Sequence, residues 1–310
     1  MELRHLRGFM AVAEELHFAR AAERLHIEQS PLSRTIKELE SDIGAQLFDR
    51  NSRGTRLTKP GEVLAEAVQR IFQAVEQARS DVQAAAAGYH CSLRIALSDG
   101  VMPQRLAAVL AQCREQEPEV EIRLFEVSLS QQLKGLREDL FDVGFARSNI
   151  VGDGIMAQAV WRTPLSIAVH ARHPLLAHKQ IPLAELLNYP LVLFHPHTHA
   201  GLHKQIESLL QQIPSPTTIA EHVSSHEVMM TLVAAGYGIG LTTEAQMMLC
   251  QNVEIVTRPL AGDQPLLTSY LLRPPKEPGE TLKRFIARVT DMDQSFQTDE
   301  SIDTPRLSKS

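Results

Sequence analysis

Side chains that can contact nucleic acid recur at helical spacing between residues 29 and 37. Hydroxyls and cations share one face of the helix expected there, and the candidate DNA-contacting residues are Gln29, Ser30, Pro31, Ser33, Arg34 and Lys37. Such groups donate hydrogen bonds to phosphate oxygens and to the base edges of a major groove. The alternative is an ordinary amphipathic helix with a solvated charged face, because helix-turn-helix look-alikes are common.

The opposite face of the same helix is apolar. Spacings of four, three and four residues place these side chains in one stripe, suited to packing on a core: Leu32, Ile36, Leu39 and Ile43. Ser30 followed by Pro31 predicts the helix start, with Ser30 as the capping residue and Pro31 at the first helical position. A shorter apolar helix expected at 18–25 precedes it, so the segment is predicted to be a helix-turn-helix.

A basic hairpin is predicted directly after this helix. Two short extended pieces flank a turn at 52–54, and the cations of the segment are Arg50, Arg53, Arg56 and Lys59. A wing of this kind commonly lies over the DNA backbone or in the minor groove, where narrow A·T tracts attract arginine. The three arginines of this segment therefore join the candidate DNA contacts.

Several segments carry a specific family resemblance: MELRHLRGFMAVAEE, FARAAERL, QSPLSRTIKELE and the wing from LFDR to LTKPG. Together they resemble the LysR-type bacterial transcriptional regulators. FDVGFARSNI, AVHARHPL and LVAAGYGIGL resemble the effector domain of that family, so the likeness covers essentially the whole chain. Within the family, ELRHLR and VHARHPL are most similar to the aromatic-catabolism regulators that respond to muconate and benzoate. The resemblance implies double-stranded DNA as a partner, a homotetramer built as a dimer of dimers, and RNA polymerase as a further candidate partner.

A heptad pattern follows the wing over residues 62–87. Spacings of four and three alternate without a break through Leu64, Val68, Ile71, Val75, Ala78, Val82 and Ala85. This pattern predicts one long helix that pairs with the same helix of a second chain. The alternative is a helix packed on its own domain. A homodimer would present two recognition helices to the half-sites of a dyad-symmetric operator.

From residue 92 onward, predicted strands alternate with predicted helices, which favours a parallel, helix-covered sheet. A second such unit begins near residue 163, and the chain returns to the first unit near residue 267. Two α/β lobes joined by crossing strands resemble a periplasmic-binding-protein-like fold. Ligands of such folds lie at the carboxyl ends of the strands, between the lobes. Candidate effector-binding residues on this rule are Ser98, Asp99, Gly100, Ser128, Arg147, Phe194, His195, Pro196 and Thr198.

Arg147 and Asp99 bear most directly on effector chemistry. Arg147 ends a predicted strand, and the resemblance places it in the GF-x-R motif of the aromatic-acid responders, where it would pair with a carboxylate. The alternative is a structural salt bridge to Asp142 or Asp153. Asp99 departs from the family pattern, in which small or hydroxyl residues are commoner, and its charge would repel an anion. Leu129 likewise replaces an expected threonine, so that Ser128 is one place out of register.

The sequence also raises chemistries other than regulation. Alternating histidines at His195, His197, His199 and His203 raise the alternative of a metal- or histidine-dependent sensor. Metal sites usually recruit a carboxylate or Cys as well, so no metal and no cofactor is expected. The chain lacks a G-x-S-x-G elbow, a Gly-rich phosphate loop and an H-E-x-x-H motif, so no enzyme is expected. A cytoplasmic solute-binding protein without a DNA role is a further alternative, but it would not account for residues 1–87.

Composition agrees with a DNA-binding protein once its charge is divided along the chain. The net charge is −6, yet residues 1–60 hold ten Lys or Arg against nine Asp or Glu. Local field at the contact surface governs phosphate attraction over a screening length of about 8–10 Å. Three widely spaced cysteines fit no disulfide framework, and no secretory or membrane segment is recognised, so a cytoplasmic protein is expected.

We therefore expect an α+β multidomain protein that regulates transcription and responds to a small organic acid or aromatic metabolite. The expected parts are a winged helix-turn-helix at 1–60, a coiled-coil linker helix at 61–88, a two-lobed α/β effector domain at 89–296, and a disordered tail at 297–310. Lobe I is expected at about 92–162 and 267–296, and lobe II at about 163–266. Effector binding would shift the population between two assembled states with different spacing of the DNA-reading heads.

Overall fold

The computed structural model describes residues 1–51, 54–100, 104–213, 216–248 and 252–300. The chain divides into two compact units within the long helix α4 (Lys59–Ala86). The first unit spans Met1–Gln83 and the second begins at Ala84. Each unit has its own hydrophobic core.

Three short helices, a hairpin and most of α4 form the first unit. The helices are α1 (Leu3–Glu15), α2 (Phe18–Arg24) and α3 (Gln29–Ile43), and the hairpin pairs β1 (Phe48–Asn51) with β2 (Gly54–Leu57) in antiparallel register. Phe48 joins the hairpin to the helical core, because its ring lies 5.3 Å from that of Phe9 and 5.9 Å from that of Phe18. The Glu40 carboxylate accepts hydrogen bonds from the backbone N–H groups of Leu47 and Phe48, which fixes the hairpin to α3.

The start and end of α3 differ in detail from the sequence prediction. The helix begins at Gln29 with Glu28 as N-cap, so the predicted cap Ser30 and the predicted first residue Pro31 both lie inside the first turn. Pro31 is tolerated there because the first N–H groups of a helix have no intrahelical acceptor. The buried stripe holds Leu32, Ile36 and Leu39 as expected, but Ile43 is 40% exposed because the helix ends at Gly44.

Helix α4 changes character along its length. Val68 is buried against the helix-turn-helix core, and Leu64 and Ile71 pack beside it, so this half of the predicted heptad seam serves its own domain. Farther along, Val75 and Val82 are 36% and 69% exposed. The alternative of a helix packed on its own domain therefore holds for the first half of α4, and pairing of the second half with another chain stays a prediction.

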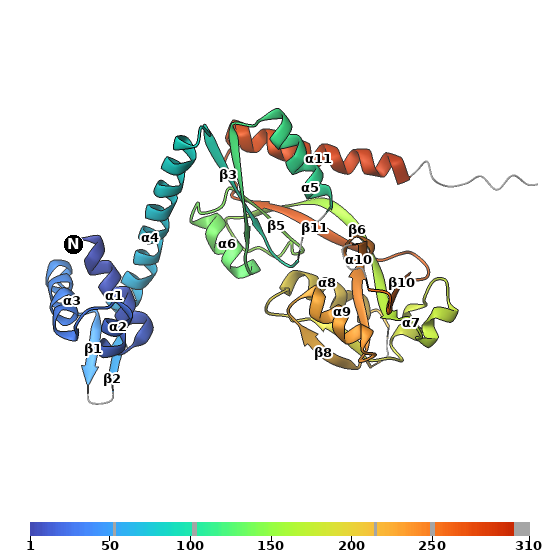
Figure 1. Ribbon diagram of the computed structural model, residues 1–310, viewed down its shortest axis with the longest axis horizontal. Coiled ribbons are helices and arrows are strands. Elements are labelled where there is room, and N and C mark those ends of the chain that lie inside the picture. The colour runs from blue at the N-terminus through green and yellow to red at the C-terminus, as the bar shows by residue number, and fades with distance from the viewer. Residues whose placement is uncertain (52–53, 101–103, 214–215, 249–251, 301–310) are drawn as a thin grey trace, which may run out of the picture. The chain divides into compact units, whose positions relative to one another are not determined.

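The second unit is built on a nine-stranded sheet in the described residues, ordered β4-β3-β5-β11-β6-β9-β7-β8 with β10 paired to β6 (Figure 1). Its strands are β3 (Cys91–Leu97), β4 (Val120–Glu126), β5 (Val143–Ala146), β6 (Met156–His170), β7 (Leu191–Phe194), β8 (Ile219–Val223), β9 (Ile239–Thr243), β10 (Ile255–Pro259) and β11 (Leu266–Arg273). The long strand β6 pairs with β11 up to Pro164 and with β9 from Leu165. This exchange of partners separates lobe I from lobe II.

The expected parallel sheet is only half correct. Strand β3 runs parallel to β4 and β5, and β7 runs parallel to β8 and β9. The crossing strands β6 and β11 run antiparallel to each other, and β11 also runs antiparallel to β5. A chain that leaves one lobe and later returns to it must run in opposite directions along the two crossing strands, which the alternation of strands and helices does not reveal.

Helices cover both lobes. Lobe I has α5 (Gln104–Gln116), α6 (Leu129–Arg137) and α11 (Glu280–Glu300); lobe II has a 3-10 turn (Pro174–Ala177), α7 (Leu183–Leu186), α8 (Ala200–Leu210), α9 (His226–Ala234) and α10 (Glu244–Met248). The backbone is helical to Glu300, so residues 297–300 do not belong to a disordered tail as expected, and 301–310 lie outside the described residues. Of the helices described, none combines the length and apolar character that a membrane crossing requires.

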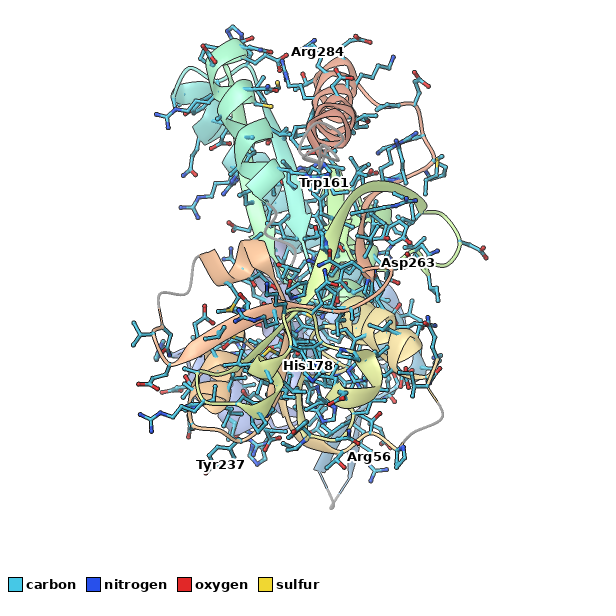
Figure 2. The ribbon with its side chains drawn as sticks, turned by 90° about the vertical axis from the view of Figure 1, so that its right-hand side faces the viewer. Arg56, Trp161, His178, Tyr237, Asp263 and Arg284 are labelled. Carbon is cyan, nitrogen blue, oxygen red and sulfur yellow. The ribbon has the colours of Figure 1, made fainter. Side chains whose placement is uncertain are left out.

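The core of lobe I contains the single tryptophan of the chain. Trp161 is 1% exposed and stacks on Phe145, with ring centroids 4.9 Å apart, among the packed side chains seen in Figure 2. Nearby, Glu117 at the end of α5 accepts hydrogen bonds from Arg284 and Arg288 of α11, the latter at 2.9 Å. These ion pairs join the helices that cover the Trp161 core.

Glu117→Gln is expected to lower the stability of the effector domain by about 2 kcal/mol, because Arg288 would lose a charge-assisted hydrogen bond at a largely buried position. The hydrogen bond from Arg288 lowers the pKa of Glu117, although burial opposes it. Because folding lowers this pKa, the ionised Glu117 carboxylate stabilises the fold at pH values above the unfolded pKa of about 4.3. The difference between variant and wild type should therefore shrink as the pH falls below about 4.

Trp161 fluorescence during urea unfolding of the full chain, at pH 7 and at stepwise lower pH, measures this difference. Glu115→Gln, at an exposed position of the same helix, is the matched control and should match the wild type. A Glu117→Gln chain as stable as wild type at pH 7 would contradict the role of the ion pairs.

Candidate DNA-contacting surface and effector cleft

The outer face of α3 carries the predicted polar residues. Gln29, Ser30, Pro31, Arg34 and Lys37 are exposed, whereas Ser33 is half-buried. Neither Arg34 nor Lys37 forms an ion pair with another described residue. Both cations are therefore available to a partner from outside the chain.

Acidic residues of α3 are held by groups of their own domain. The Glu40 carboxylate binds the amides at the base of the hairpin, and Glu38 lies 3.7 Å from the imidazole of His5. Asp42 pairs with the terminal ammonium of Met1 at 2.8 Å. The cations without ion pairs thus precede the engaged acids along α3, which leaves a locally basic surface on a chain of net negative charge.

The wing is described only in part. Arg56 lies exposed on β2, and Arg50 lies on β1 opposite Thr55, although its side chain is outside the described residues. The position of Arg53 also lies outside them. Lys59, counted with the wing in the sequence, instead begins α4 and pairs with Glu62 at 2.9 Å.

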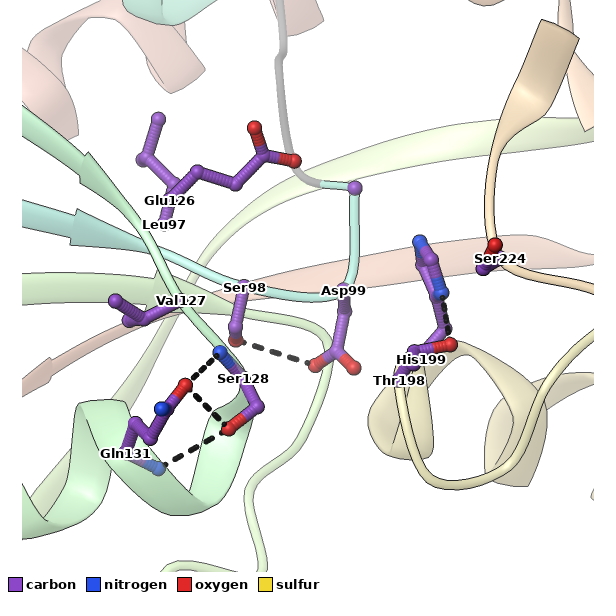
Figure 3. A pocket seen from close by; sticks show the side chains of 11 residues that line it. Leu97, Ser98, Asp99, Glu126, Val127, Ser128, Gln131, Thr198, His199 and Ser224 are labelled. Carbon is purple, nitrogen blue, oxygen red and sulfur yellow. Dashed lines mark hydrogen bonds between the residues drawn. The ribbon is translucent and has the colours of Figure 1, made fainter. Parts of the chain in front are cut away.

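A cavity of about 300 Å³ opens between the two lobes of the second unit (Figure 3). Five predicted effector residues line it, namely Ser98, Asp99, Gly100, Ser128 and Thr198. Its other lining residues were not predicted: Leu97, Glu126, Val127, Gln131, His199 and Ser224. Most of these eleven residues end strands β3, β4 and β8 or begin helices α6 and α8, as expected for the carboxyl edge of an α/β sheet.

Ser128 enters the cleft as the N-cap of α6. Its hydroxyl accepts a hydrogen bond from the backbone N–H of Gln131, and the Gln131 side chain accepts one from the backbone N–H of Ser128. This capping box was present in the sequence as S-x-x-Q and could have identified Gln131 as a lining residue. The same strand-end rule that selected Ser98 also applies to Glu126 and Ser224, at the ends of β4 and β8.

Asp99 joins the two lobes. One carboxylate oxygen accepts a hydrogen bond from the backbone N–H of Gly201 in α8, at 3.0 Å, and the other accepts one from that of Arg147, at 3.2 Å. Figure 3 shows its carboxylate between Ser128 of lobe I and the Thr198–His199 turn of lobe II. Asp99 and Gly100 have positive φ values of 58° and 63°, a conformation that favours glycine and is tolerated by aspartate.

Burial sets the protonation behaviour of the cleft. It raises the pKa of Asp99, an effect opposed by the N–H groups of Gly201 and Arg147 and by nearby positive charge. Burial also lowers the pKa of His199, against the attraction of Asp99 and Glu126, so its imidazole is held toward the neutral form. Glu126 is exposed at the cavity. The charged groups that line the cavity in the described residues are therefore carboxylates.

Arg147 occupies a different environment from the one predicted. It is 6% exposed and follows β5, but it is not among the residues that line the cavity. Burial lowers the pKa of its guanidinium to about 10, with Asp99 opposing that shift. The alternative salt bridge to Asp142 is wrong, because Asp142 pairs with Arg94 at 2.8 Å. A buried Nη1 of Arg147 has no hydrogen-bond partner among the described residues.

Phe194, His195 and Pro196 lie beside the cleft and not in its lining. Phe194 is buried in lobe II. Its carbonyl oxygen lies 2.9 Å from Nδ1 of His203, which donates to it in the tautomer protonated at Nδ1. Imidazole rings contact one another nearby, with His195 5.3 Å from His197 and 6.0 Å from His222. Even so, no group of three or more candidate ligands among the described residues is arranged to hold a metal ion, so the metal-sensor alternative gains no support.

Gly201→Ala is expected to destabilise the effector domain by about 1–3 kcal/mol through overpacking. An added Cβ would lie 2.6 Å from Asp99 Oδ2 and 2.7 Å from the carbonyl carbon of Arg147, and backbone cannot yield easily. Because alanine is otherwise the better helix former, a loss of stability in this variant can be attributed to the close contact with Asp99 and Arg147. Thermal unfolding of the full chain measures the effect, and Gly279→Ala, which adds a Cβ into open space, is the control. Equal stability of the Gly201→Ala and wild-type chains would refute the close interlobe approach.

Two family models match the chain in succession. Residues 3–62 match the model described as bacterial regulatory helix-turn-helix protein, lysR family, and residues 86–294 match the LysR substrate binding domain. The uncharacterised HTH-type transcriptional regulator YnfL of Escherichia coli (strain K12) is 32% identical over 275 residues, covering 88% of this chain and 92% of YnfL.

Two further relatives agree. The HTH-type transcriptional regulator BenM of Acinetobacter baylyi is 31% identical over 243 residues, covering 78% of this chain and 80% of BenM. The crystal structure of CbnR, a LysR family transcriptional regulator, aligns with a TM-score of 0.76 at 25% identity, covering 94% of this chain and 99% of CbnR. The predicted fold class is thereby confirmed, and the chain belongs to the LysR family of transcriptional regulators, with a DNA-binding helix-turn-helix and an effector-binding domain in place of an enzyme active site.

Proposed function

We propose that this LysR-type regulator reads an operator with the exposed face of α3 and is controlled by a small molecule held in the cleft beside Asp99. The separation of charge along α3 carries the first half of the proposal. Arg34 and Lys37 are free of ion pairs within the described residues, while Glu38, Glu40 and Asp42 are engaged. The proposed domain limits remain 1–60, 61–88 and 89–296.

Arg34 is proposed to contact a base edge in the major groove, with Gln29, Ser30, Pro31, Ser33 and Lys37 as further contacts. Arginine donates to guanine in two hydrogen bonds, whereas phosphate contacts position the protein without reading sequence. Arg56, with Arg50 and Arg53, is proposed to contact the backbone or the minor groove. CbnR has been crystallised with its target DNA, which supports a DNA complex of the same kind here.

A homodimer through α4 is proposed to present two such surfaces to a dyad-symmetric operator. The exposed valines Val75 and Val82 lie on the predicted heptad seam and would be covered by the same helix of a second chain. Assembly into a dimer of dimers and contact with RNA polymerase are proposed from the family. Residence in the cytoplasm, where the DNA is, is part of the same proposal.

The cleft is proposed to bind the effector through its polar lining. Its volume of about 300 Å³ is at the lower end of ligand pockets, so it suits a small metabolite. A ligand that favours one arrangement of the lobes would shift the population of assembled states. Control by an organic acid or an aromatic metabolite stays a prediction, as does a ligand contact for Arg147, Phe194, His195 or Pro196.

Arg34→Ala is expected to lower affinity for the preferred operator about 5- to 150-fold, corresponding to about 1–3 kcal/mol, and to relax base preference at one position of each half-site. A preferred sequence would first be selected from random duplexes with the wild-type chain, and both proteins would then be titrated on it and on bulk DNA. Arg79→Ala, which removes an exposed cation from α4, is the control. An equal loss on operator and bulk DNA would show that Arg34 contacts only phosphate.

Val82→Glu is expected to weaken dimerisation at least tenfold, since it places like charges face to face in an apolar seam. Sedimentation of the full chain over a concentration series measures the association constant. Gln83→Glu introduces the same charge one residue outside the seam and should leave the association unchanged. Dimerisation that survives Val82→Glu would place the subunit contact elsewhere in the chain.

A further inference from the structure

At each of two helix starts that border the cleft, one backbone N–H group that could attract an anion already has an acceptor. At the start of α6, the N–H of Gln131 is bound by the Ser128 hydroxyl. At the start of α8, the N–H of Gly201 is bound by the Asp99 carboxylate. A helix N-terminus with a free N–H group is a ready anion site, but here two helix starts at the cleft are capped from within the protein.

Asp99 differs from Ser128 because its cap is a carboxylate, whose ionised form the N–H groups of Gly201 and Arg147 favour although burial raises its pKa. It is 2% exposed and receives one backbone N–H on each carboxylate oxygen. Gly201 allows the approach, since any side chain there would collide with the Asp99 carboxylate. The protein thus places its own carboxylate where an acidic ligand would bind.

An incoming carboxylate would meet unfavourable charge. Asp99 and Glu126 both line the cavity, and its described lining includes neither lysine nor arginine. The Arg147 guanidinium acts on Asp99 from outside that lining and offsets part of its charge, whereas burial holds the His199 imidazole toward neutrality. Like charges in a partly desolvated site repel more strongly than in water.

A cationic group would find acceptors in the same place. An ionised carboxylate offers about four lone-pair positions, and backbone N–H groups use two of those on Asp99. An ammonium group has three donors, some of which the remaining lone-pair positions of Asp99 can accept, and the Glu126 carboxylate elsewhere in the cavity lining adds a favourable negative charge. The hydroxyls of Ser128, Thr198 and Ser224 supply further acceptors around the cavity.

We propose that the cleft selects effectors that carry a protonated primary amine, which binds at Asp99 with Glu126 adding negative charge to the cavity, and that it rejects carboxylic acids lacking an amine. This selectivity rests on the proposed function of the cleft as the effector site. It narrows the expected organic acids and aromatic metabolites to amine-bearing ones, such as an amino acid or an arylalkylamine.

Matched amines and acids test the proposal on the full-length chain. Calorimetric titration would compare 2-phenylethylamine with 3-phenylpropanoate, and butylamine with butyrate, at neutral pH. In the wild type, the Kd of the better amine is expected to be at least tenfold below that of its matched acid. Carboxylates that bind as tightly as the amines, or a complete lack of amine binding, would overturn the proposal.

Asp99→Gly tests which residue sets the preference. Glycine adopts the positive φ of this position without strain, and its substitution frees the Gly201 N–H while removing one negative charge. The variant is expected to reverse the order, binding the acid at least tenfold more tightly than the wild type does. Asp139→Gly is the control, because Asp139 has a similar φ of 56° but is exposed and pairs with Lys276.

Asp99→Asn keeps the shape of the residue and an oxygen for the Gly201 N–H, so it guards against misfolding of the glycine variant. It is expected to lose amine binding without gaining acid binding. Retention of the wild-type amine preference in either variant would overturn the role of Asp99. A DNA footprint with the bound amine separates this proposal from the previous one: an unchanged footprint would refute control through the cleft while leaving the selectivity established.

Discussion

The effector domain depends on polar contacts that replace the backbone partners lost where its strands end. Asp99 receives N–H groups from Arg147 and Gly201, and the Gln205 side chain of α8 bonds the carbonyl of Arg147 and both backbone groups of Thr268 on β11. These side chains satisfy buried backbone groups across the lobe boundary. A lobe movement that parts them must therefore supply other partners, from water or from a ligand.

The same logic explains the GF-x-R motif noticed in the sequence. Gly144 precedes Phe145 in β5, and a Cβ on Gly144 would lie 2.5 Å from the amide nitrogen of Gln132. The fully buried Gln132 side chain donates to the carbonyls of Ala96 and Phe145 and accepts from the hydroxyl of Ser98. Glycine in this motif therefore leaves room for the amide that connects α6 to two strands and positions a cleft residue.

Periodicity allowed the sequence to predict regular elements better than their ends. The apolar stripe of α3 follows directly from residue spacing, yet its N-cap is Glu28 and not Ser30, because a capping side chain is a preference and proline is tolerated throughout the first turn. The rule that ligands lie at strand ends selected five residues that line the cleft. It also selected Phe194, whose side chain packs in the core of lobe II. The rule locates an edge of the sheet, whereas side-chain direction depends on packing between elements distant in sequence. Strand direction at β6 and β11 was hidden for the same reason.

The division of α4 into a buried half and an exposed half has a mechanical consequence. Because Val68 and its neighbours share a core with the helix-turn-helix, the reading head and this helix must turn together as one rigid lever. At a rise of 1.5 Å per residue, its 28 residues span about 40 Å. A tilt of only a few degrees at the far end would displace the head by a few ångströms, enough to carry a recognition helix out of step with successive base pairs.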